Sequence, residues 1–286
     1  MTEKNEKHLK KPDWLKIKLP GGKKFARVKE IVEGNKLHTI CISGNCPNMG
    51  ECWNAGTATF MILGDICTRS CRFCATKSGR PLPLDSEEPA RVADSIRLMN
   101  LRHCVITSVD RDDLPDGGAA HWAATIKKIK EVNPGVTIEV LIPDFKGNTK
   151  HLDLVIAEKP DIISHNLETV RRLTPQIRSA ASYDRSLKVL NHIALSGITA
   201  KSGIMVGIGE TENEVFETMD NLLGLGVKIM TIGQYLRPTL SHLPVEEYIT
   251  PEVFEKYRLS GIEMGFRHIE SRPLVRSSYH AEKHIE

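Results

Sequence analysis

The sequence lacks several features that mark large classes of proteins. It contains no apolar run approaching the roughly 20 residues that cross a membrane. The N-terminus has no apolar core of a secretion signal, and its acidic residues argue against an organelle transit peptide. We therefore expect a soluble, cytoplasmic protein that does not bind membranes.

A strong excess of charge of one sign is also missing. The 39 Lys and Arg stand against 36 Asp and Glu, which disfavours bulk binding of nucleic acid. The basic excess is local, because lysines crowd the first stretch: Lys4, Lys7, Lys10, Lys11, Lys16, Lys18, Lys23 and Lys24. Two interpretations stay open for this stretch, a solvated and partly disordered tail or a patch that steers an acidic partner.

Cysteine is scarce, with seven in 286 residues. Without a secretion signal, these cysteines point to metal binding or catalysis rather than to disulfides. The odd number indicates that one cysteine stands outside a set. Six of the seven form two close triplets, one at Cys41, Cys46 and Cys52 and the other at Cys67, Cys71 and Cys74.

Short apolar segments alternate with segments of helical periodicity from about residue 59 onward, which predicts an α/β fold. The expected strands are rich in Val and Ile and cover Thr59–Leu63, Cys104–Val109, Val136–Ile142, Asp161–Ser164, Lys201–Ile208 and Lys228–Ile232. The expected helices cover Pro89–Met99, Ala119–Val132, His151–Ala157, Ser186–Leu195 and Glu212–Leu223.

The last expected helix has a clear start signal, because Thr211 followed by Glu214 predicts a capping box. Strands that alternate with helices imply parallel pairing through right-handed crossovers. The number of βα units is about six, short of a full TIM barrel, so we expect a partial (β/α)6 TIM-like barrel. Active sites of such folds lie at the carboxyl ends of the strands, which directs attention to the residues just after each strand.

The second triplet follows the first expected strand with the spacing C-x3-C-x2-C. Thiolates are soft ligands that suit iron–sulfur clusters and zinc. A structural zinc takes four protein ligands, and no fourth Cys or His stands near Cys67, Cys71 and Cys74. Three thiolates grip three corners of a four-iron cluster and leave one iron open. The spacing and its place resemble the radical S-adenosylmethionine (radical SAM) superfamily, in which the open iron binds S-adenosylmethionine.

The first triplet has the spacing C-x4-C-x5-C and lies before the barrel, in a stretch with Gly44, Pro47 and Gly50 that is typical of an irregular loop. The spacing matches no common zinc finger. A second cluster is the favoured interpretation, with zinc as the alternative.

Together the triplets and several rarer motifs resemble the lipoyl synthases. These motifs are Lys11–Lys16, Thr68–Cys74, Val109–Leu114 and Arg276–Ala281, and the resemblance covers nearly the whole chain. It implies an N-terminal extension at residues 1–56 with the auxiliary cluster cysteines, a radical SAM barrel at 57–265, and a C-terminal segment at 266–286 that closes over the auxiliary cluster.

The resemblance also implies two [4Fe-4S] clusters. The auxiliary cluster, at Cys41, Cys46 and Cys52, takes its fourth ligand from the C-terminal motif, either Ser278 or its neighbour Ser277. It is the sulfur source and is dismantled during turnover, so Ser278 counts among the catalytic residues together with Cys67, Cys71 and Cys74. A serine oxygen is a hard ligand for iron and is released more readily than a thiolate.

Contacts to S-adenosylmethionine are expected at the strand ends. The segment Gly203–Glu210 resembles the superfamily's fifth-strand motif, with Gly207 beside the cofactor, although glycines that end a strand before a helix are common. Asn166 and Glu168 follow the fourth strand as ribose or methionine contacts, and Arg178 would pair with the methionine carboxylate.

Four further features have competing interpretations. His165 is expected to make hydrogen bonds at the barrel rim rather than to act as a ligand or base. Cys104 is expected to pack as a small apolar residue. The charged cluster Arg111–Asp113 either orders the site or belongs to a solvated loop. Ile42 and Glu270–Arg272 depart from the family pattern and bear on how the C-terminal segment closes.

The expected reaction inserts sulfur at carbons 6 and 8 of a protein-bound octanoyl chain. The partners implied are octanoylated carriers (a glycine-cleavage H protein or a dehydrogenase acyltransferase subunit), an electron donor such as flavodoxin or ferredoxin, and a carrier that rebuilds the cluster. Three alternatives stay open: another sulfur-inserting radical enzyme, a two-cluster electron-transfer protein, and a structural zinc protein.

Overall fold

The computed structural model describes residues 9–17, 21–55, 57–178 and 180–284. Lys4, Lys7 and Lys18 of the basic stretch lie outside these ranges. Lys23 and Lys24 begin helix α1 (Lys23–Gly34), whose Val28 and Val32 are buried, so the end of the basic stretch is folded rather than a tail. None of the helices in the described ranges is long and apolar enough to cross a membrane.

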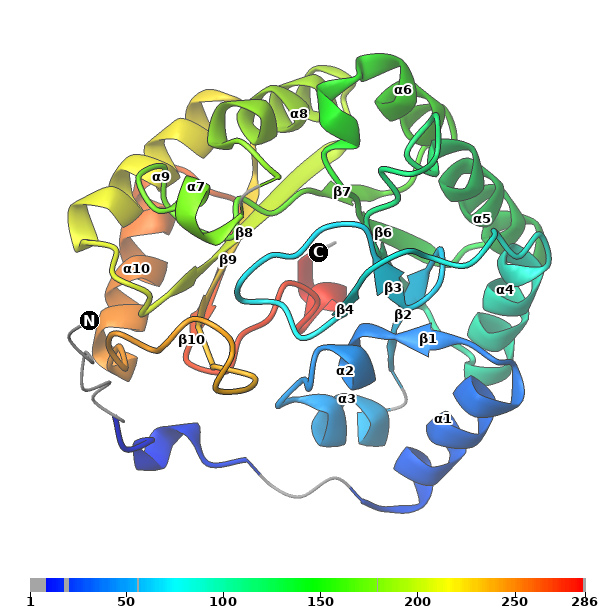
Figure 1. Ribbon diagram of the computed structural model, residues 1–286, viewed down its shortest axis with the longest axis horizontal. Helices are drawn as coiled ribbons and strands as arrows, with labels where there is room; N and C mark the ends of the chain where they lie inside the picture. The colour runs from blue at the N-terminus through cyan, green and yellow to red at the C-terminus, as the bar shows by residue number, and fades with distance from the viewer. Residues whose placement is uncertain (1–8, 18–20, 56, 179, 285–286) are drawn as a thin grey trace.

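One curved sheet forms the centre of the fold, with helices around its outside (Figure 1). Its order is β1-β2-β5-β6-β7-β8-β9-β10, and every neighbouring pair is parallel except β1 and β2. The strands are β1 (His38–Thr39), β2 (Thr59–Ile62), β5 (His103–Ser108), β6 (Thr137–Leu141), β7 (Ile162–Ser164), β8 (Thr199–Val206), β9 (Ile229–Gln234) and β10 (His268–Arg272). A two-stranded ladder pairs β3 (Ile66–Cys67) with β4 (Lys77–Ser78).

The helices cover the outer face of the sheet in chain order. The larger ones are α4 (Glu88–Met99), α5 (Ala119–Val132), α6 (Thr149–Ala157), α8 (Tyr183–Leu195), α9 (Glu212–Gly224) and α10 (Pro251–Met264). Short helices are α2 (Ile40–Ser43), α3 (Met49–Ala55), α7 (Thr174–Ile177), and the 3-10 turns η1 (Asp13–Leu15), η2 (Phe145–Gly147) and η3 (Ala281–His284). The capping box at Thr211 and Glu214 is present.

The expected α/β architecture is confirmed, and all six expected strands form. Two strands of the large sheet, β1 and β10, were not expected; they come from the stretches before and after the barrel core. The short strands β3 and β4 were not expected either. The division of the chain at residues 56 and 265 stays a prediction. β1 and β10 are the two ends of the sheet, so the barrel does not close by hydrogen bonding between them.

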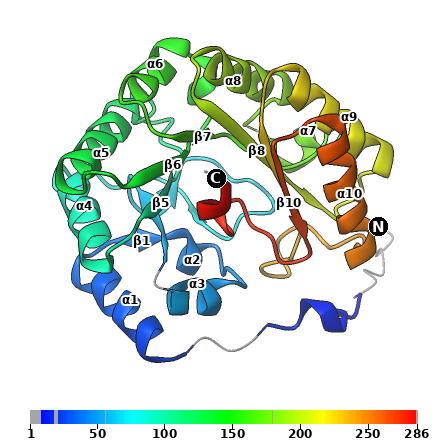
Figure 2. The same ribbon diagram turned by 180° about the vertical axis from the view of Figure 1, so that it is seen from behind.

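The space between these two ends is occupied by α2, α3 and the C-terminal segment (Figures 1 and 2). From β10 the chain runs inward, and η3 lies in the middle of the ring of strands when the molecule is seen from behind (Figure 2). The segment that follows the predicted barrel therefore passes through the barrel rather than over its surface.

Candidate active site

The cysteine loop crosses the open end of the barrel after β2: Cys67 is the last residue of β3, and Cys71 and Cys74 follow it (Figure 1). Backbone N–H groups of Arg69 and Asp110 donate to the sulfur of Cys67, at 3.4 and 3.3 Å. The N–H of Cys74 donates to the carbonyl oxygen of Cys71 at 3.1 Å. These hydrogen bonds fold the loop so that the thiols face one region.

A buried cation fixes this loop to the neighbouring strand ends. The guanidinium of Arg69 donates to both carboxylate oxygens of Asp112, at 2.7 and 2.9 Å, and to Asp144 at 2.7 Å. A third carboxylate, Asp110, lies 3.3 Å away. The Arg69 side chain is only 4% exposed, and Asp144 is fully buried. Bidentate Arg–carboxylate pairs fix geometry as well as charge, so the loop is tied to β5 and β6.

The loop after β9 holds the cysteine loop from the other side. The N–H of Leu243 donates to the carbonyl oxygen of Arg72 at 3.2 Å. The Nε2 of His242 lies 3.0 Å from the carbonyl oxygen of Cys74. The hydroxyl of Tyr235, at the end of the strand, donates to the carbonyl oxygen of Leu243 at 2.9 Å. The three cysteines are thus held between the loops after β5, β6 and β9.

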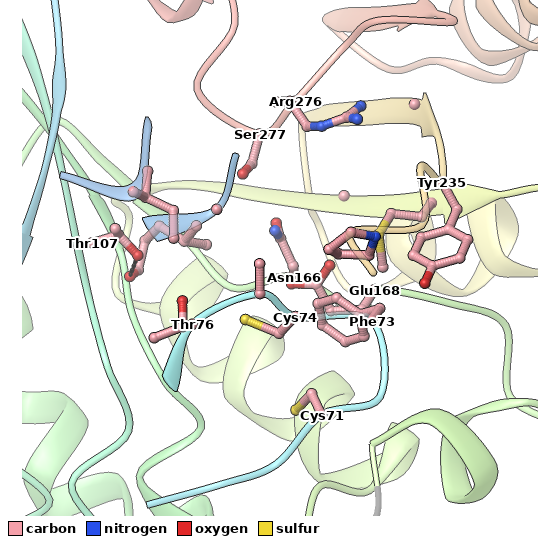
Figure 3. Close-up of a pocket in the computed structure, with 18 of the residues that line it drawn as sticks. Cys71, Phe73, Cys74, Thr76, Thr107, Asn166, Glu168, Tyr235, Arg276 and Ser277 are labelled. Atoms are coloured by element: carbon pink, nitrogen blue, oxygen red, sulfur yellow. Dashed lines mark hydrogen bonds between the residues drawn. The ribbon is translucent and has the colours of Figure 1, made fainter. Parts of the chain in front are cut away.

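A cavity of about 470 Å³ adjoins the cysteine loop and has Cys67, Cys71 and Cys74 in its wall. Most of its remaining wall comes from the carboxyl ends of the strands, as the barrel rule predicts. Figure 3 shows Asn166 and Glu168 facing Cys71 and Cys74 across this space. Its apolar wall includes Met61, Val109, Ile142, Met205 and Leu236.

Three of the predicted cofactor contacts line this cavity: Asn166, Glu168 and Arg178. Arg178 donates from one terminal nitrogen to the carbonyl oxygens of Asn166 and Leu167, at 3.1 and 3.0 Å. Its Nε and the side-chain oxygen of Asn166 are buried and have no hydrogen-bond partner in the described part of the chain. Burial raises the pKa of Glu168, which has a φ of 66°. These groups are available to a polar ligand.

The structure gives Gly207 a different environment from the one expected. Gly207 is not part of the cavity wall, whereas Gly203 of the same motif is. At Gly207 φ is 90°, and a Cβ there would lie 2.2 Å from Nε2 of Gln234 and 2.3 Å from the carbonyl oxygen of Glu247. Glycine is needed here for close packing within the protein. Its predicted contact with the cofactor stays a prediction.

The first triplet, at Cys41, Cys46 and Cys52, is gathered by α2, α3 and the turn between them. The N–H of Cys46 donates to the carbonyl oxygen of Cys41 at 3.0 Å, and that of Cys52 to Asn48 at 2.9 Å. Burial raises the pKa of Cys41 to about 11 and that of Cys52 to about 12, and a charge on Cys46 raises both further. The three thiols are therefore close enough to interact.

Residues beside Cys46 reach the same cavity as the second triplet. Gly44, Asn45 and Pro47 belong to its wall, together with Ser277 of the C-terminal motif. Figure 3 shows Ser277 descending toward the cavity from the C-terminal segment, opposite Cys74. One cavity therefore extends from the second cysteine triplet to the residues that flank Cys46 of the first triplet.

The C-terminal motif is packed against the first triplet. The hydroxyl of Thr59 donates to that of Ser278 at 2.8 Å, and the hydroxyl of Tyr279 donates to Glu51 at 3.0 Å. The side-chain amide of Asn48 donates to the carbonyl oxygen of Leu274 at 2.7 Å. Ser278 therefore lies at the side of the barrel by β2, and Ser277 at the cavity.

Burial also raises the pKa of two thiols of the second triplet, to about 11 for Cys67 and about 12 for Cys71. The thiols of Cys67 and Cys71 therefore stay protonated at neutral pH when no metal is bound. Because metal ligation needs thiolates, binding of a cluster must release their protons. In the described residues, no three or more His, Cys, Asp or Glu side chains form a site for a single metal ion.

Several secondary expectations are confirmed. His165 is 2% exposed and bonds the carbonyl oxygen of Ile142 and the hydroxyl of Ser186, both at 2.9 Å, and burial lowers its pKa to about 4. Cys104 is 1% exposed in the apolar core. Arg111 is 3% exposed and donates to the backbone of Leu63, so its cluster orders the site and the solvated-loop alternative is wrong.

Sequence reasoning missed Arg69, Asp144 and His242. Asp144 follows β6 by three residues, so the rule of inspecting residues after each strand would have found it. Arg69 stands between the cysteines and was noticed only as part of a motif. The loop with His242 follows β9 but reaches its partner 168 residues away, which no local pattern reveals.

Comparisons with known proteins agree with this geometry. Residues 61–222 match the family model of the radical SAM superfamily, and residues 1–46 match that of the N-terminal domain of lipoyl synthase. A lipoyl synthase of Parabacteroides distasonis is 66% identical over 278 residues, which is 97% of this chain and 99% of the relative. A lipoyl synthase of Flavobacterium psychrophilum is 60% identical over 276 residues, 96% of this chain and 95% of the relative.

Solved structures share the fold at low sequence identity. The FeFe-hydrogenase maturase HydG of Carboxydothermus hydrogenoformans superposes with a TM-score of 0.60 at 14% identity, over 86% of this chain and 64% of that one. Methylornithine synthase gives a TM-score of 0.56 at 14% identity, over 74% of this chain and 63% of that one. The fold is the partial barrel of radical SAM enzymes, and the full-length similarity is more specific. The chain is an enzyme, and it belongs to the lipoyl synthase family of the radical SAM superfamily.

Proposed function

We propose that this enzyme inserts two sulfur atoms, at carbons 6 and 8 of an octanoyl-lysine on a carrier protein, and that an auxiliary cluster supplies the sulfur. One observation carries this proposal: a single cavity has the thiols of Cys67, Cys71 and Cys74 in its wall together with residues that flank Cys46. A substrate in this cavity would be within reach of both cysteine sets.

The residues around the second triplet fit a [4Fe-4S] cluster with S-adenosylmethionine. Three thiols in one loop leave one iron without a protein ligand. Beside them, among the residues that the structure describes, the buried Nε of Arg178 lacks an acceptor and the side-chain oxygen of Asn166 lacks a donor. An unsatisfied buried donor costs about 1–3 kcal/mol. The carboxylate and ammonium of a methionine moiety would satisfy these two groups, and Glu168 would accept from the ammonium or the ribose.

The residues around Cys41, Cys46 and Cys52 fit a second cluster of the same kind. The three thiols are buried or half-buried and mutually close, while Ser278 and Ser277 present hydroxyl groups on the segment that covers them. Either serine would complete four ligands. A hydroxyl ligand is weaker for iron than a thiolate, which suits a cluster that gives up sulfur.

When bound, the first cluster and S-adenosylmethionine supply one-electron chemistry, which carbons 6 and 8 require because neither is acidic or polarised. The protein's own part is placement and exclusion of water. Met61, Ile142 and Met205 line the cavity as an apolar path for the octanoyl chain. Arg178 and Asn166 orient the cofactor, and Arg69 holds the cysteine loop in place.

The cellular context follows from this assignment. The partners would be octanoylated H protein or dehydrogenase acyltransferase subunits, an electron donor such as flavodoxin or ferredoxin, and a carrier that rebuilds the auxiliary cluster. All seven cysteines are free thiols. Free thiols at these positions favour the reducing cytoplasm as the place of action.

The decisive experiment is mass spectrometry of an octanoyl-lysine carrier peptide after anaerobic incubation with the reconstituted enzyme, reductant and S-adenosylmethionine. We expect two sulfur atoms to be added. Cys46→Ala should still form 5′-deoxyadenosine without adding sulfur, and Cys71→Ala should do neither. Cys104→Ala is the matched control, because this cysteine lies outside both triplets, and it should retain both activities.

A peptide left without sulfur by an enzyme that carries both clusters would refute the assignment. Formation of 5′-deoxyadenosine with modification of a different substrate would instead favour another sulfur-inserting radical enzyme.

A further inference from the structure

The interior of the barrel holds a charged pair where barrels of this type normally have apolar layers. Nζ of Lys201 on β8 lies 2.6 Å from Oε1 of Glu139 on β6, and the two side chains are 0% and 1% exposed. Ser164 on β7, between these strands, donates to the same carboxylate oxygen at 3.1 Å. Inward side chains of three successive strands therefore form one polar layer.

The C-terminal turn η3 docks on this layer. The Nδ1 of His284 lies 3.1 Å from Nζ of Lys201, and the backbone carbonyl oxygen of His284 accepts from Arg267 at 3.0 Å. The ring of His284 packs on that of His268, with 4.6 Å between centroids. His284 and Ala281 are each 1% exposed. His268 is the first residue of β10, so η3 fills the barrel at the end opposite the cysteine loop (Figure 2).

The chain between β10 and η3 carries the serines of the C-terminal motif. Where this segment leaves β10, the N–H of Gln234 donates to the carbonyl oxygen of Pro273 at 3.2 Å. The guanidinium of Arg276 donates to the carbonyl oxygen of Gln234, also at 3.2 Å. The segment ends in η3, inside the barrel. The motif is thus stretched between two fixed points, with Ser278 against β2 halfway between them.

The polar layer favours a hydrogen-bond acceptor on η3 beside Lys201, which is the position of His284. A buried ion pair is often no more stabilising than apolar residues of similar volume, and its best-supported role is to specify one arrangement. The ammonium of Lys201 needs an additional acceptor, which the neutral imidazole of His284 provides. Burial lowers the pKa of His284, and Glu139, whose Oε2 lies 3.9 Å from Nδ1, offsets this only in part, so the imidazole is neutral at physiological pH.

We propose that Glu139, Lys201 and His284 are positioning residues for the auxiliary cluster: they anchor η3 inside the barrel and thereby hold residues 276–280 against Cys41, Cys46 and Cys52. This inference rests on the proposed function of that triplet. When the serine releases its iron during turnover, the anchor keeps the segment inside the barrel, ready to bind the rebuilt cluster.

The test compares His284→Leu, which removes the acceptor, with His284→Asn, whose amide oxygen takes the place of Nδ1. Loss of one hydrogen bond to a charged group should speed amide exchange of residues 276–283 in the cluster-free protein by at least about tenfold. His284→Asn should restore slow exchange. Arg267→Ala, a change at an exposed side chain that leaves the barrel interior intact, should shift exchange in the same direction by a smaller factor.

The second readout is the iron content after reconstitution. The wild type should hold about eight irons per chain and His284→Leu closer to four, because the auxiliary cluster is lost while the first is retained. Formation of 5′-deoxyadenosine should be unchanged in the variant. Unchanged exchange and unchanged iron in His284→Leu would overturn the anchor. About four irons in the wild type would overturn the proposed function instead, and the exchange data would still decide on the anchor.

Discussion

Arg69 offers the sharpest test of how the cysteine loop is held. Its guanidinium donates to Asp112 and Asp144, and Asp144 is completely buried. Arg69→Gln would leave buried carboxylates without their main cation, a change that typically costs about 3–5 kcal/mol. Arg185 still donates to Asp144 at 3.2 Å, so we expect the lower end, about 3 kcal/mol, in urea unfolding of the cluster-free protein at pH 7.

The same variant should change how stability depends on pH. Burial acts to raise the pKa of Asp144, but the hydrogen bond and the positive charge of Arg69, with smaller contributions from neighbouring groups, together more than offset this and bring the pKa to about 2. In the wild type this carboxylate stabilises the fold above its unfolded pKa near 4, and the contribution is lost as pH falls toward 2. Without Arg69 that contribution is gone, so the gap between wild type and variant should shrink by about 1 kcal/mol at pH 3.

Arg171→Gln is the matched control for this experiment. Arg171 pairs with Asp184 at the surface, where the two side chains are 48% and 67% exposed. Exposed ion pairs contribute less than about 1 kcal/mol, and salt screens them. If Arg69→Gln lost no more stability than Arg171→Gln, or if its loss were the same at pH 7 and pH 3, the account of Arg69 as the buried clamp of the loop would be wrong.

Three further changes test other parts of the structure. His165 is buried and neutral in the fold, whereas the unfolded chain takes up a proton at this histidine as the pH falls. Between pH 7 and pH 5 the free energy of unfolding of the wild type should therefore fall by about 2 kcal/mol more than that of His165→Gln. Urea unfolding at both pH values measures the difference. Thr211→Ala should cost about 1 kcal/mol by removing the capping box, read as a lower melting temperature. Gly207→Ala should cost at least about 2 kcal/mol through backbone strain and overpacking, whereas Gly224→Ala, with open space around it, should cost nothing.

The core of the fold was predictable because its strands and helices carry strong local signals. The six expected strands all form, and α5 has the expected bounds of Ala119–Val132. The N-terminal helix α1 was missed because its lysines obscured the spacing of Val28 and Val32. The helix α10 was missed although Thr250 before Pro251 and Gly265 after Met264 are ordinary start and stop signals.

The two missed strands explain a deeper limit. β10 (His268–Arg272) is short, and Ile269 is its only apolar residue, so it lacks the Val- and Ile-rich composition that marked the expected strands. Its partner β9 buries it from one side, and the hydroxyl of Ser271 donates to a backbone carbonyl of α10 at 2.7 Å. Its stability depends on tertiary contacts, which propensity does not report.

In the candidate site, too, residues marked by a local pattern were predicted and residues that depend on tertiary contacts were not. The cysteines and the polar residues Asn166, Glu168 and Arg178 were found because a motif or a strand end marks each of them. The groups that hold these residues in place were not found, since Arg69 and Asp144 are 75 positions apart in the sequence. The C-terminal motif illustrates both sides: its serines were recognisable, but its path through the barrel depends on His284 meeting Lys201, 83 residues away. A buried cation and a distant histidine have no shared sequence pattern. Their pairing arises because the chain after β10 turns into the barrel, where η3 meets the inward side chain of Lys201 on β8.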